Sequence, residues 1–413
     1  MTKLNTSLNK YLSGLILMTF FIFGLTTLTV AQEHGAAAEE NPKEEIGAIA
    51  HDEHEELEAE EKFNMQDMIF NHINNSNEFH LFGHVAIPLP CILYSREDGF
   101  TTFLSSKLEH GHKAFNRYVL DHGTVKRMPL GFPEGEVEIG HMTHEKVNKI
   151  EFTKLKHNGT EYEVQSASNL MKFTSFYDFS ISKNVFTMLL AALILCLIFL
   201  SVAKAYKTRP GQAPRGLQNF MEVIVNFIID EVAKPMLGHK YMTFLPYLLT
   251  IFFFIMTINL MGLIPFFPFG ANVTGNIATT MALAVLTFII TNINGNGAYW
   301  KHIFWMPGVP APMKLFLAPI EFMGVFIKPI SLMIRLFANI TAGHVIILSL
   351  VGLIFVFGKV GTSIAGATTG ALVAIPFTMF MNLIEVIVAL IQAFIFTILS
   401  ASYFGAATEE AHH

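Results

Sequence analysis

Residues 313–357 read MKLFLAPIEFMGVFIKPISLMIRLFANITAGHVIILSLVGLIFVF, a stretch in which apolar side chains outnumber all others. At 1.5 Å per residue, a helix of this length would extend well over ~60 Å, whereas the hydrocarbon layer of a bilayer is only ~30 Å thick. Such a helix has to lie steeply tilted or bent, and Pro319 and Pro329 are natural places for bends. The stretch therefore predicts a membrane protein with at least one long, steeply tilted helix.

Arg335 lies near the middle of this stretch. Inserting an arginine at the centre of a membrane helix costs roughly 2.5–3.5 kcal/mol on translocon scales. The side chain cannot escape this cost by losing its proton, because a guanidinium stays protonated at any accessible pH. Arg335 is therefore a fixed positive charge at membrane depth, and a charge in that position is typical of a functional site.

The composition places most of the chain in lipid. Hydrophobic residues make up 52% of the 413 positions and charged residues 15%, and the mean hydropathy is +0.45. Soluble globular proteins do not have this composition. The only cysteines are Cys91 and Cys196, and the second lies inside an apolar run, which argues against a disulfide scaffold or a Cys-rich metal site.

The N-terminus has the pattern of an export signal. Lys3 and Lys10 precede an apolar run, and small residues near Ala31 suit cleavage, so we expect a signal peptide over residues 1–31. Residues 32–62 are rich in Ala, Glu and His and too polar to bury a core, which predicts an acidic flexible tail rather than a metal site.

Residues 63–183 have the pattern of a small β-containing domain. Apolar and polar residues alternate on both sides of Asn158-Gly159, a dipeptide that favours a two-residue β-hairpin turn. Residues 84–94 are broken by prolines and read as an edge strand or loop. No catalytic constellation is recognisable in this domain, and its sequence does not indicate a role.

The rest of the chain, residues 184–413, reads as an all-α polytopic membrane domain with five crossings. Spans are expected at about 185–206, 242–264, 275–293, 313–357 and 369–406. Basic residues follow the first span directly, so its far end is expected in the cytoplasm. The β-containing domain would then be exported, and the C-terminus would be cytoplasmic.

Two details complete this expected topology. Residues 216–236 are amphipathic and suit a helix at the cytoplasmic interface. The last span contains Pro376 and is again too long for an ordinary crossing, so the fold is expected to end in two long, steeply tilted helices. Gly358 to Gly370 would form the turn between them.

Helical geometry collects the polar residues around Arg335 on one side. With 100° per residue, one narrow sector contains Glu321, Lys328, Ser331, Arg335 and Asn339. His344 points to the opposite side of this helix, toward a different neighbour. In the final helix a second stripe contains Asn382, Glu385 and Gln392. Two facing stripes of this kind would line a hydrated path.

These polar residues also have a purely structural interpretation, because buried polar groups hold membrane helices together. For Asn259, Ser331 and Asn382 taken singly, this adhesive role and a functional role are equally supported. For the ionisable group of Arg335, Glu321, Lys328, His344 and Glu385, function is favoured. Several titratable types together suggest proton handling.

The stretches PISLMIRLFANITAGH (329–344) and LIQAFIFTILSASY (390–403) resemble the signature of subunit a of F-type rotary ATP synthases. NLMGLIP (259–265) resembles an earlier motif of that family, and the resemblance covers roughly residues 185–410. It implies two long tilted helices packed against a rotor. It also implies that Arg335 is the essential stator arginine facing the c-ring, with Asn339 and Gln392 as polar neighbours and two aqueous half-channels.

The resemblance further implies a non-catalytic, proton-translocating subunit of the cell inner membrane, with its N-terminal domain in the periplasm. Its implied partners are the c-ring subunits, the peripheral-stalk b subunits, the remainder of the ATP synthase and the lipid bilayer. No cofactor and no nucleic acid are expected, and direct nucleotide binding is not expected because the chain has no nucleotide-binding loop.

The chain departs from many bacterial relatives in two places. Those relatives carry an acid where His344 stands and a histidine where Glu385 stands, so the pair is exchanged here, as in the mitochondrial arrangement. The exchange preserves a His–Glu contact between helices. Gly262 replaces an acidic residue found in some bacterial relatives, so no role is transferred to that position.

Two other function classes stay open from the residues alone. In an independent secondary transporter or ion channel, Arg335 would pair with an anionic substrate or a gate, but the repeated halves common in transporter folds are not recognisable here. An intramembrane hydrolase would need a nucleophile with a base, or a metal motif. Proton and sodium coupling also both stay open, because the ion-binding carboxylate would belong to the rotor.

Overall fold

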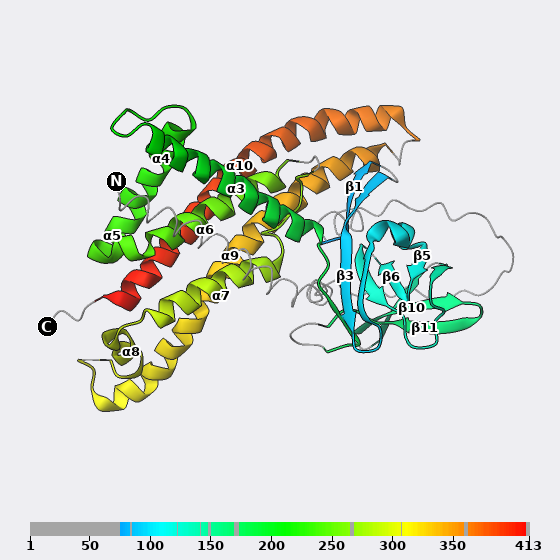
Figure 1. Ribbon diagram of the computed structural model, residues 1–413, viewed down its shortest axis with the longest axis horizontal. Helices are drawn as coiled ribbons and strands as arrows, with labels where there is room; N and C mark the ends of the chain where they lie inside the picture. The colour runs from blue at the N-terminus through cyan, green and yellow to red at the C-terminus, as the bar shows by residue number, and fades with distance from the viewer. Residues whose placement is uncertain are drawn as a thin grey trace.

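The computed structural model describes most of the chain after the acidic tail, namely residues 75–82, 85–121, 123–140, 142–147, 150–168, 173–264, 268–306, 308–358 and 362–409. The expected signal peptide (1–31) and acidic tail (32–62) lie outside these residues. Figure 1 shows two parts: a β-rich domain and an elongated helical region, joined where the chain enters helix α3.

In the described part of the chain, the β-rich domain consists of four small antiparallel sheets. In spatial order the sheets are β1 (Glu78–Phe82) with β2 (Val85–Pro88); β12 (Phe176–Asp178), β3 (Pro90–Ser95) and β4 (Gly99–Leu104); β7 (Thr124–Arg127), β6 (Tyr118–Asp121), β5 (Lys113–Phe115) and β8 (Glu136–Glu138); and β11 (Thr160–Val164), β10 (Ile150–His157) and β9 (Met142–Val147). A short 3₁₀ segment, η2 (Ser105–Gly111), links β4 to β5. Alternate side chains of these strands fill two small apolar cores.

The hairpin predicted at Asn158-Gly159 is confirmed. Strands β10 and β11 pair antiparallel up to His157 and Thr160, which leaves a two-residue turn. Asn158 and Gly159 have φ values of 49° and 80°. This is the left-handed region that such a turn requires at both central positions.

The interpretation of residues 84–94 as an edge strand or loop is wrong for β3. Strand β3 is the central strand of its sheet, paired with β12 on one side and β4 on the other. The prolines do not interrupt it, because Pro88 ends β2 and Pro90 begins β3. The missing N–H of Pro90 therefore falls at the end of the strand, while its carbonyl oxygen still accepts a hydrogen bond from the N–H of Ile181.

A cluster of charged side chains closes the core beneath the β3–β4 hairpin. Asp98 accepts hydrogen bonds from Arg117 and Arg127, and Arg127 also binds Glu97 at 2.8 Å. The two arginine side chains are almost completely buried, with exposed fractions of 5% and 2%. Buried guanidinium groups need such partners, because an unpaired charge in this environment is strongly destabilising.

The helical region runs from residue 183 to residue 408. Its elements are α3 (Lys183–Thr208), α4 (Leu217–Ile228), the π-helical turn η3 (Ile229–Ala233), α5 (Lys234–Leu237), the 3₁₀ turn η4 (Gly238–Lys240), α6 (Tyr241–Gly262), α7 (Ile277–Ile293), α8 (Gly297–Phe304), α9 (Ala311–Phe357) and α10 (Ile364–Thr408). Among the described residues, four helical stretches are long and apolar enough to cross a membrane. The number becomes five if α7 and α8, bent by 104°, form one broken span.

Helix α6 lies at the centre of the helical region. Its buried side chains pack against α3 and α10, as in the aromatic pairs Phe199–Phe253 and Phe244–Phe404, whose ring centroids lie 5.1 and 4.8 Å apart. Asn276 caps α7 by accepting hydrogen bonds from the N–H groups of Ala278 and Thr279. The multi-pass architecture therefore rests on one continuous apolar core.

The two long C-terminal helices are confirmed as single helices of 47 and 45 residues. They lie side by side in Figure 1, and α9 continues through Pro319 and Pro329 as α10 continues through Pro376. The expected turn from Gly358 to Gly370 is too long, because Ser363 caps α10 by accepting a hydrogen bond from the N–H of Gly366.

The glycines of that segment pack helix against helix. A Cβ atom on Gly366 would lie 1.9 Å from the carbonyl oxygen of Phe357, and one on Gly370 would lie 3.2 Å from the Cα of Ile354. Small residues let membrane helices approach closely in this way. Glycine therefore marks close contact with α9 here, not an extended turn.

Hydrogen bonds also hold the other end of the α9–α10 pair, where α10 terminates. The N–H of Asn296 donates to the carbonyl oxygen of Ala407 at 3.0 Å, and the Asn296 side chain donates to the carbonyl oxygen of Glu409 at 2.5 Å. Lys240 Nζ donates to the carbonyl oxygen of Thr408 at 2.9 Å. The C-terminal end of α10 is thus held by the segments before α6 and α8.

The buried charge cluster predicts a specific weakness of the β-rich domain. Asp98→Asn leaves Arg117 and Arg127 with only Glu97 as an anionic partner among the described residues. It should lower the free energy of unfolding of the domain by about 2 kcal/mol. A fully buried ion pair that loses one partner costs ~3–5 kcal/mol. The expected value is smaller because Glu97 remains and Asp98 is partly exposed. The rate of limited proteolysis within this domain measures the change. Glu109→Gln, which breaks the exposed Glu109–Lys113 pair, is the matched control and should have little effect.

The same cluster gives the wild-type domain a pH dependence. Burial raises the pKa of Asp98, but hydrogen bonds from Arg117 and Arg127 outweigh it and hold the pKa below its ordinary value. The ion cluster therefore contributes stability above the ordinary aspartate pKa of about 3.9, and this contribution is lost as the pH falls through the lower pKa of the folded state. Asp98→Asn should lack this acid-dependent component. An acid dependence identical to the wild type would contradict the assignment.

Candidate functional site

The polar stripe of α9 lies on an open face of the helix. Lys328, Ser331, Arg335 and Asn339 are exposed and Glu321 is half-buried, so these predicted site residues share one side. A neighbouring side of the same turns, centred about 100° around the helix from Arg335, carries Leu332, Leu336 and Ile340, which are at most 3% exposed and belong to the apolar core. Packing of these three side chains fixes the orientation of α9 and leaves Arg335 on an exposed side of the helix.

Arg335 has no ionic partner in the part of the chain that the structure describes. Its guanidinium lies within electrostatic range of the Tyr403 phenol of α10. Lys328 Nζ lies 5.8 Å from the centre of the same ring. Tyr403 therefore connects two cations of the α9 stripe to α10, while no described carboxylate neutralises Arg335.

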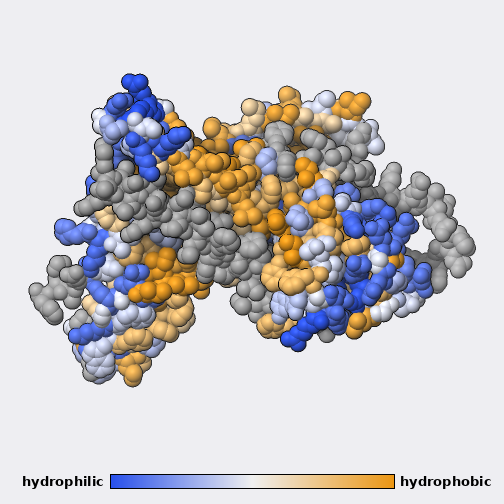
Figure 2. Space-filling view, viewed as in Figure 1, coloured by the Kyte–Doolittle hydropathy of each residue, from blue (hydrophilic) through white to orange (hydrophobic). Residues whose placement is uncertain are grey.

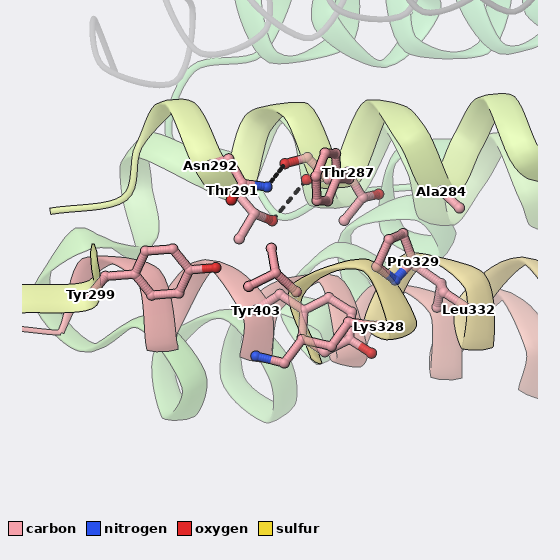
Figure 3. Close-up of a pocket in the computed structure, with 11 residues that line it drawn as sticks. Ala284, Thr287, Thr291, Asn292, Tyr299, Lys328, Pro329, Leu332 and Tyr403 are labelled. Atoms are coloured by element: carbon pink, nitrogen blue, oxygen red, sulfur yellow. Dashed lines mark hydrogen bonds between the residues drawn. The ribbon is translucent and has the colours of Figure 1, made fainter. Parts of the chain in front are cut away.

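A small pocket opens beside Lys328 and Tyr403, between α7, α8, α9 and α10 (Figure 3). Its polar lining includes Thr287, Thr291, Asn292 and Tyr299, and the Tyr299 hydroxyl points into it. The Asn292 amide donates to the carbonyl oxygen of Phe288 at 2.7 Å, but its own oxygen is buried without a hydrogen-bond partner among the described residues. Such a pocket suits water or a proton.

Sequence analysis missed most of this pocket. Only Lys328 was among the predicted site residues. Thr287, Thr291 and Asn292 lie on an apolar helix without any charge, so they resemble ordinary polar residues of a membrane span. The hydroxyl groups at positions 287 and 291, one helical turn apart, were the only signal that could have indicated a polar lining.

A second polar cluster joins α9 to α10 on another side. His344 Nε2 lies 3.8 Å from Glu385 Oε1, with exposed fractions of 13% and 3% for the two side chains. Both carboxyl oxygens of Glu385 are buried without a hydrogen-bond partner among the described residues. The interhelical His–Glu contact predicted from the sequence is present. Because both side chains are largely buried, adding a proton to the His344 imidazole or to the Glu385 carboxylate changes the net charge of this cluster.

Two glycines make room for this contact. A Cβ atom on Gly343 would lie 2.7 Å from Glu385 Oε1 and 2.9 Å from its Cδ. At Gly262, a Cβ atom would lie 3.7 Å from His344 Nε2. His344 and Glu385 thus occupy space that larger residues would fill.

The expectation of two directly facing stripes is wrong for Glu385. The α9 stripe is exposed, whereas Glu385 and Gln392 are buried and Asn382 is half-buried. Glu385 meets Gly343 and His344, and His344 points away from the Arg335 stripe. The cause is the close approach of α10 at Gly343, which places the carboxylate against the side of α9 and not along its open face.

Asn259 has a structural position. Its amide donates to the carbonyl oxygen of Ala389 at 3.4 Å, and its oxygen accepts a hydrogen bond from Thr274 Oγ1 at 2.7 Å. It therefore ties α6 to α10 and to the segment before α7. This geometry favours the adhesive role over direct participation in a polar path.

Comparison with known proteins agrees with the sequence resemblance. The family model described as ATP synthase A chain matches residues 185–405. Residues 68–153 match a domain of unknown function (DUF8433).

Three curated relatives show the extent of the similarity. ATP synthase subunit a of Chloroherpeton thalassium is 44% identical over 57% of this chain and 69% of its own length. ATP synthase subunit a 2 of Chlorobaculum tepidum is 44% identical over 56% and 64%. ATP synthase subunit a of Anaeromyxobacter dehalogenans is 36% identical over 71% and 75%. The chain belongs to the ATP synthase A chain family, the multi-pass, proton-translocating and non-catalytic subunits of the membrane sector of ATP synthase.

Proposed function

We propose that this chain forms the stationary side of the proton path of a rotary ATP synthase, with two half-channels and with Arg335 facing a carboxylate on the c-ring. One observation carries the proposal: Arg335 is a permanent cation on an open face of α9, and no described carboxylate of its own chain pairs with it. An unpaired charge at membrane depth is costly, so its partner comes from another subunit.

The surface around Arg335 supports a helical, largely apolar partner. Ile327, Ile330 and Ile334 of α9 are each at least 50% exposed, and so are Leu383 and Ile387 of α10. A partner that covers this surface has to be apolar itself and has to carry one acidic group level with the guanidinium. Helices of a c-ring, each with one ion-binding carboxylate, meet both requirements.

Arg335 would act on the protonation of that carboxylate. Opposite charges at close range attract by several kcal/mol at an effective dielectric near 20, so the guanidinium favours the ionised form. Away from Arg335 the carboxyl group takes up a proton and turns, neutral, toward lipid. The fixed charge also separates the two half-channels, because a proton cannot pass the guanidinium without a carrier.

The two polar clusters are suitably placed to serve as the half-channels. Lys328 precedes Arg335 by seven residues and His344 follows it by nine, which corresponds to about 10 Å and about 14 Å along the helix. The cluster of His344 and Glu385 would admit protons from the exported side. The pocket beside Lys328 and Tyr403 would release them to the cytoplasm.

This assignment agrees with the orientation expected from the charges. Lys204, Lys207, Arg209 and Arg215 lie at and after the end of α3, which favours a cytoplasmic location for that end. The β-rich domain would then be exported, and the C-terminus would be cytoplasmic. In the complex the chain would contact the c-ring through α9 and α10, with peripheral-stalk b subunits as further partners. Membership of the family argues against a solitary transporter or a hydrolase.

Arg335→Ala should abolish proton-driven ATP synthesis in vesicles that contain the assembled complex. Arg335→Lys should fail as well, because an ammonium lacks the planar fork of the guanidinium and loses its proton more readily when desolvated. Ile334→Ala, an exposed neighbour without charge, is the control for surface truncation and should retain synthesis. Substantial coupled synthesis by Arg335→Ala would exclude the proposed role.

His344 and Glu385 should act as one unit in proton entry. His344→Ala and Glu385→Ala should each lower proton flux. The fold loss of flux in the double variant should be smaller than the product of the two single fold losses, because the contact between His344 and Glu385 is removed only once. Proton flux into vesicles driven by a potassium diffusion potential measures this. His344→Ala combined with Lys328→Ala is the control pair and should be multiplicative, since the two residues serve opposite half-channels. Multiplicative losses for His344 and Glu385 would place them on separate stretches of the path.

Gly343→Ala should reduce proton flux severalfold by displacing the buried Glu385 carboxylate. Its Cβ atom would lie 2.7 Å from Glu385 Oε1, closer than real Cβ contacts allow. Combining it with Glu385→Asp shortens the acid and should restore part of the flux. Gly324→Ala, on the same helix with no atom within 4 Å of its new Cβ, is the matched control. Equal effects of the two glycine variants would refute this explanation.

A further inference from the structure

The sheet formed by β12, β3 and β4 has one side that faces away from the domain core. Strand alternation turns Cys91, Leu93, Phe103 and Phe176 inward, where each is at most 8% exposed. The strand register then groups the outward residues into three rows. These rows are Tyr177, Tyr94 and Phe100; Phe179, Ile92 and Thr102; and Ile181, Pro90 and Leu104. We call this set the outer sheet face.

The outer sheet face carries no charged residue. Eight of its nine positions are apolar or aromatic, and Thr102 is the exception. Phe100 is 72% exposed, Leu104 50% and Phe179 37%. The rings of Tyr94 and Phe100 lie 4.8 Å apart and those of Tyr177 and Phe179 6.5 Å apart, so the aromatic residues form a continuous surface. Contiguous exposed patches of this kind mark interaction sites.

The position of the face relative to the membrane helices indicates its occupant. Only four residues separate the end of β12, at Asp178, from the start of α3 at Lys183. Ile181, at one edge of the face, already packs against the apolar core of the helical region. The face is therefore continuous with the part of the chain that enters the bilayer, and α3 itself exposes Leu189 and Leu193 just beyond it.

The direction of the strands agrees with contact along the membrane surface. In Figure 1, β3 runs across the direction of α3 and α7 and does not continue it. Figure 2 shows hydrophobic surface on the side of the β-rich domain toward the helices, whereas hydrophilic surface dominates the visible side that is turned away from the helices.

We propose that the outer sheet face rests on the lipid bilayer, with Phe100, Leu104 and Phe179 inserted at the level of the headgroups. Tyr94 and Tyr177 suit this position because a tyrosine presents an apolar ring and a polar hydroxyl, the reason tyrosine is enriched at membrane interfaces. The absence of charge suits lipid better than a soluble protein partner, whose interfaces usually carry a polar rim. Docking would hold the β-rich domain against the membrane beside α3.

The test uses the assembled complex in phosphatidylcholine vesicles. Phe100→Cys is labelled with a small fluorescent maleimide, and its emission is measured with brominated phosphatidylcholine and with aqueous iodide. Leu130→Cys is the matched control, because Leu130 is 70% exposed in the same domain but lies outside this sheet. The unaltered chain, whose Cys91 is buried and whose Cys196 is inside α3, gives the background.

At position 100 the label should lose most of its emission with brominated lipid and should be protected from iodide. At position 130 the label should be quenched by iodide and should keep its emission with brominated lipid. Leu104→Cys should repeat the result at a second position of the face. Quenching by iodide equal to that of the control would overturn the proposal. Protection from both quenchers would also overturn it, because a protein segment would then cover the face. Equal lipid quenching at Leu130 would likewise overturn it, because contact with lipid would then not be specific to the outer sheet face.

Discussion

The arrangement of the helical region depends on holding one permanent cation outside the chain's own core. Leu332, Leu336 and Ile340 anchor one side of α9 in the apolar core, and the helical repeat then places Arg335 on a neighbouring, exposed side. A guanidinium cannot neutralise itself, so it needs either a partner or water. The packed side of α9 thus determines where the charge is presented, and the rest of the fold has to keep that side fixed.

Close contact between α9 and α10 supplies this rigidity and also shapes the second polar cluster. Gly366 and Gly370 let the helices approach near the turn, and Gly343 lets the Glu385 carboxylate approach α9 further along. Close contact at glycine residues therefore serves two purposes. Near the turn, close contact stabilises the helix pair. At Gly343 it places a buried acid beside His344, and among the described residues the oxygens of that acid have no hydrogen-bond partner.

Much of this architecture follows from the sequence because strong physical constraints act locally. Helix length and hydropathy predicted the two long helices, the helical repeat predicted that the polar residues around Arg335 share one side of α9, and Asn158-Gly159 predicted a hairpin. The same local patterns gave the wrong turn at Gly358–Gly370, since a glycine used for close packing resembles a glycine used in a turn.

The remaining features depend on contacts between distant segments. Strand β3 became central because β12, more than eighty residues later, adds to its other edge. The pocket at Lys328 combines side chains from four helices, and none of the α7 residues in it carries a charge. The position of Glu385 depends on a glycine of another helix. Periodicity within one segment contains no information about such pairings.

The way in which the C-terminal helix pair is held has a mechanical consequence. A short connection joins α9 and α10 at one end, and hydrogen bonds from Lys240 and Asn296 fix the last turn of α10 at the other. The connection ties the two helices to each other, and the hydrogen bonds anchor the pair at the end where α10 terminates, with Arg335 in the middle portion of α9. A moving partner that pulls sideways on the guanidinium would bend both helices together, and two side-by-side helices resist bending better than one. The sideways force would then pass to the hydrogen bonds made by Lys240 and Asn296 and not be lost as local distortion of α9.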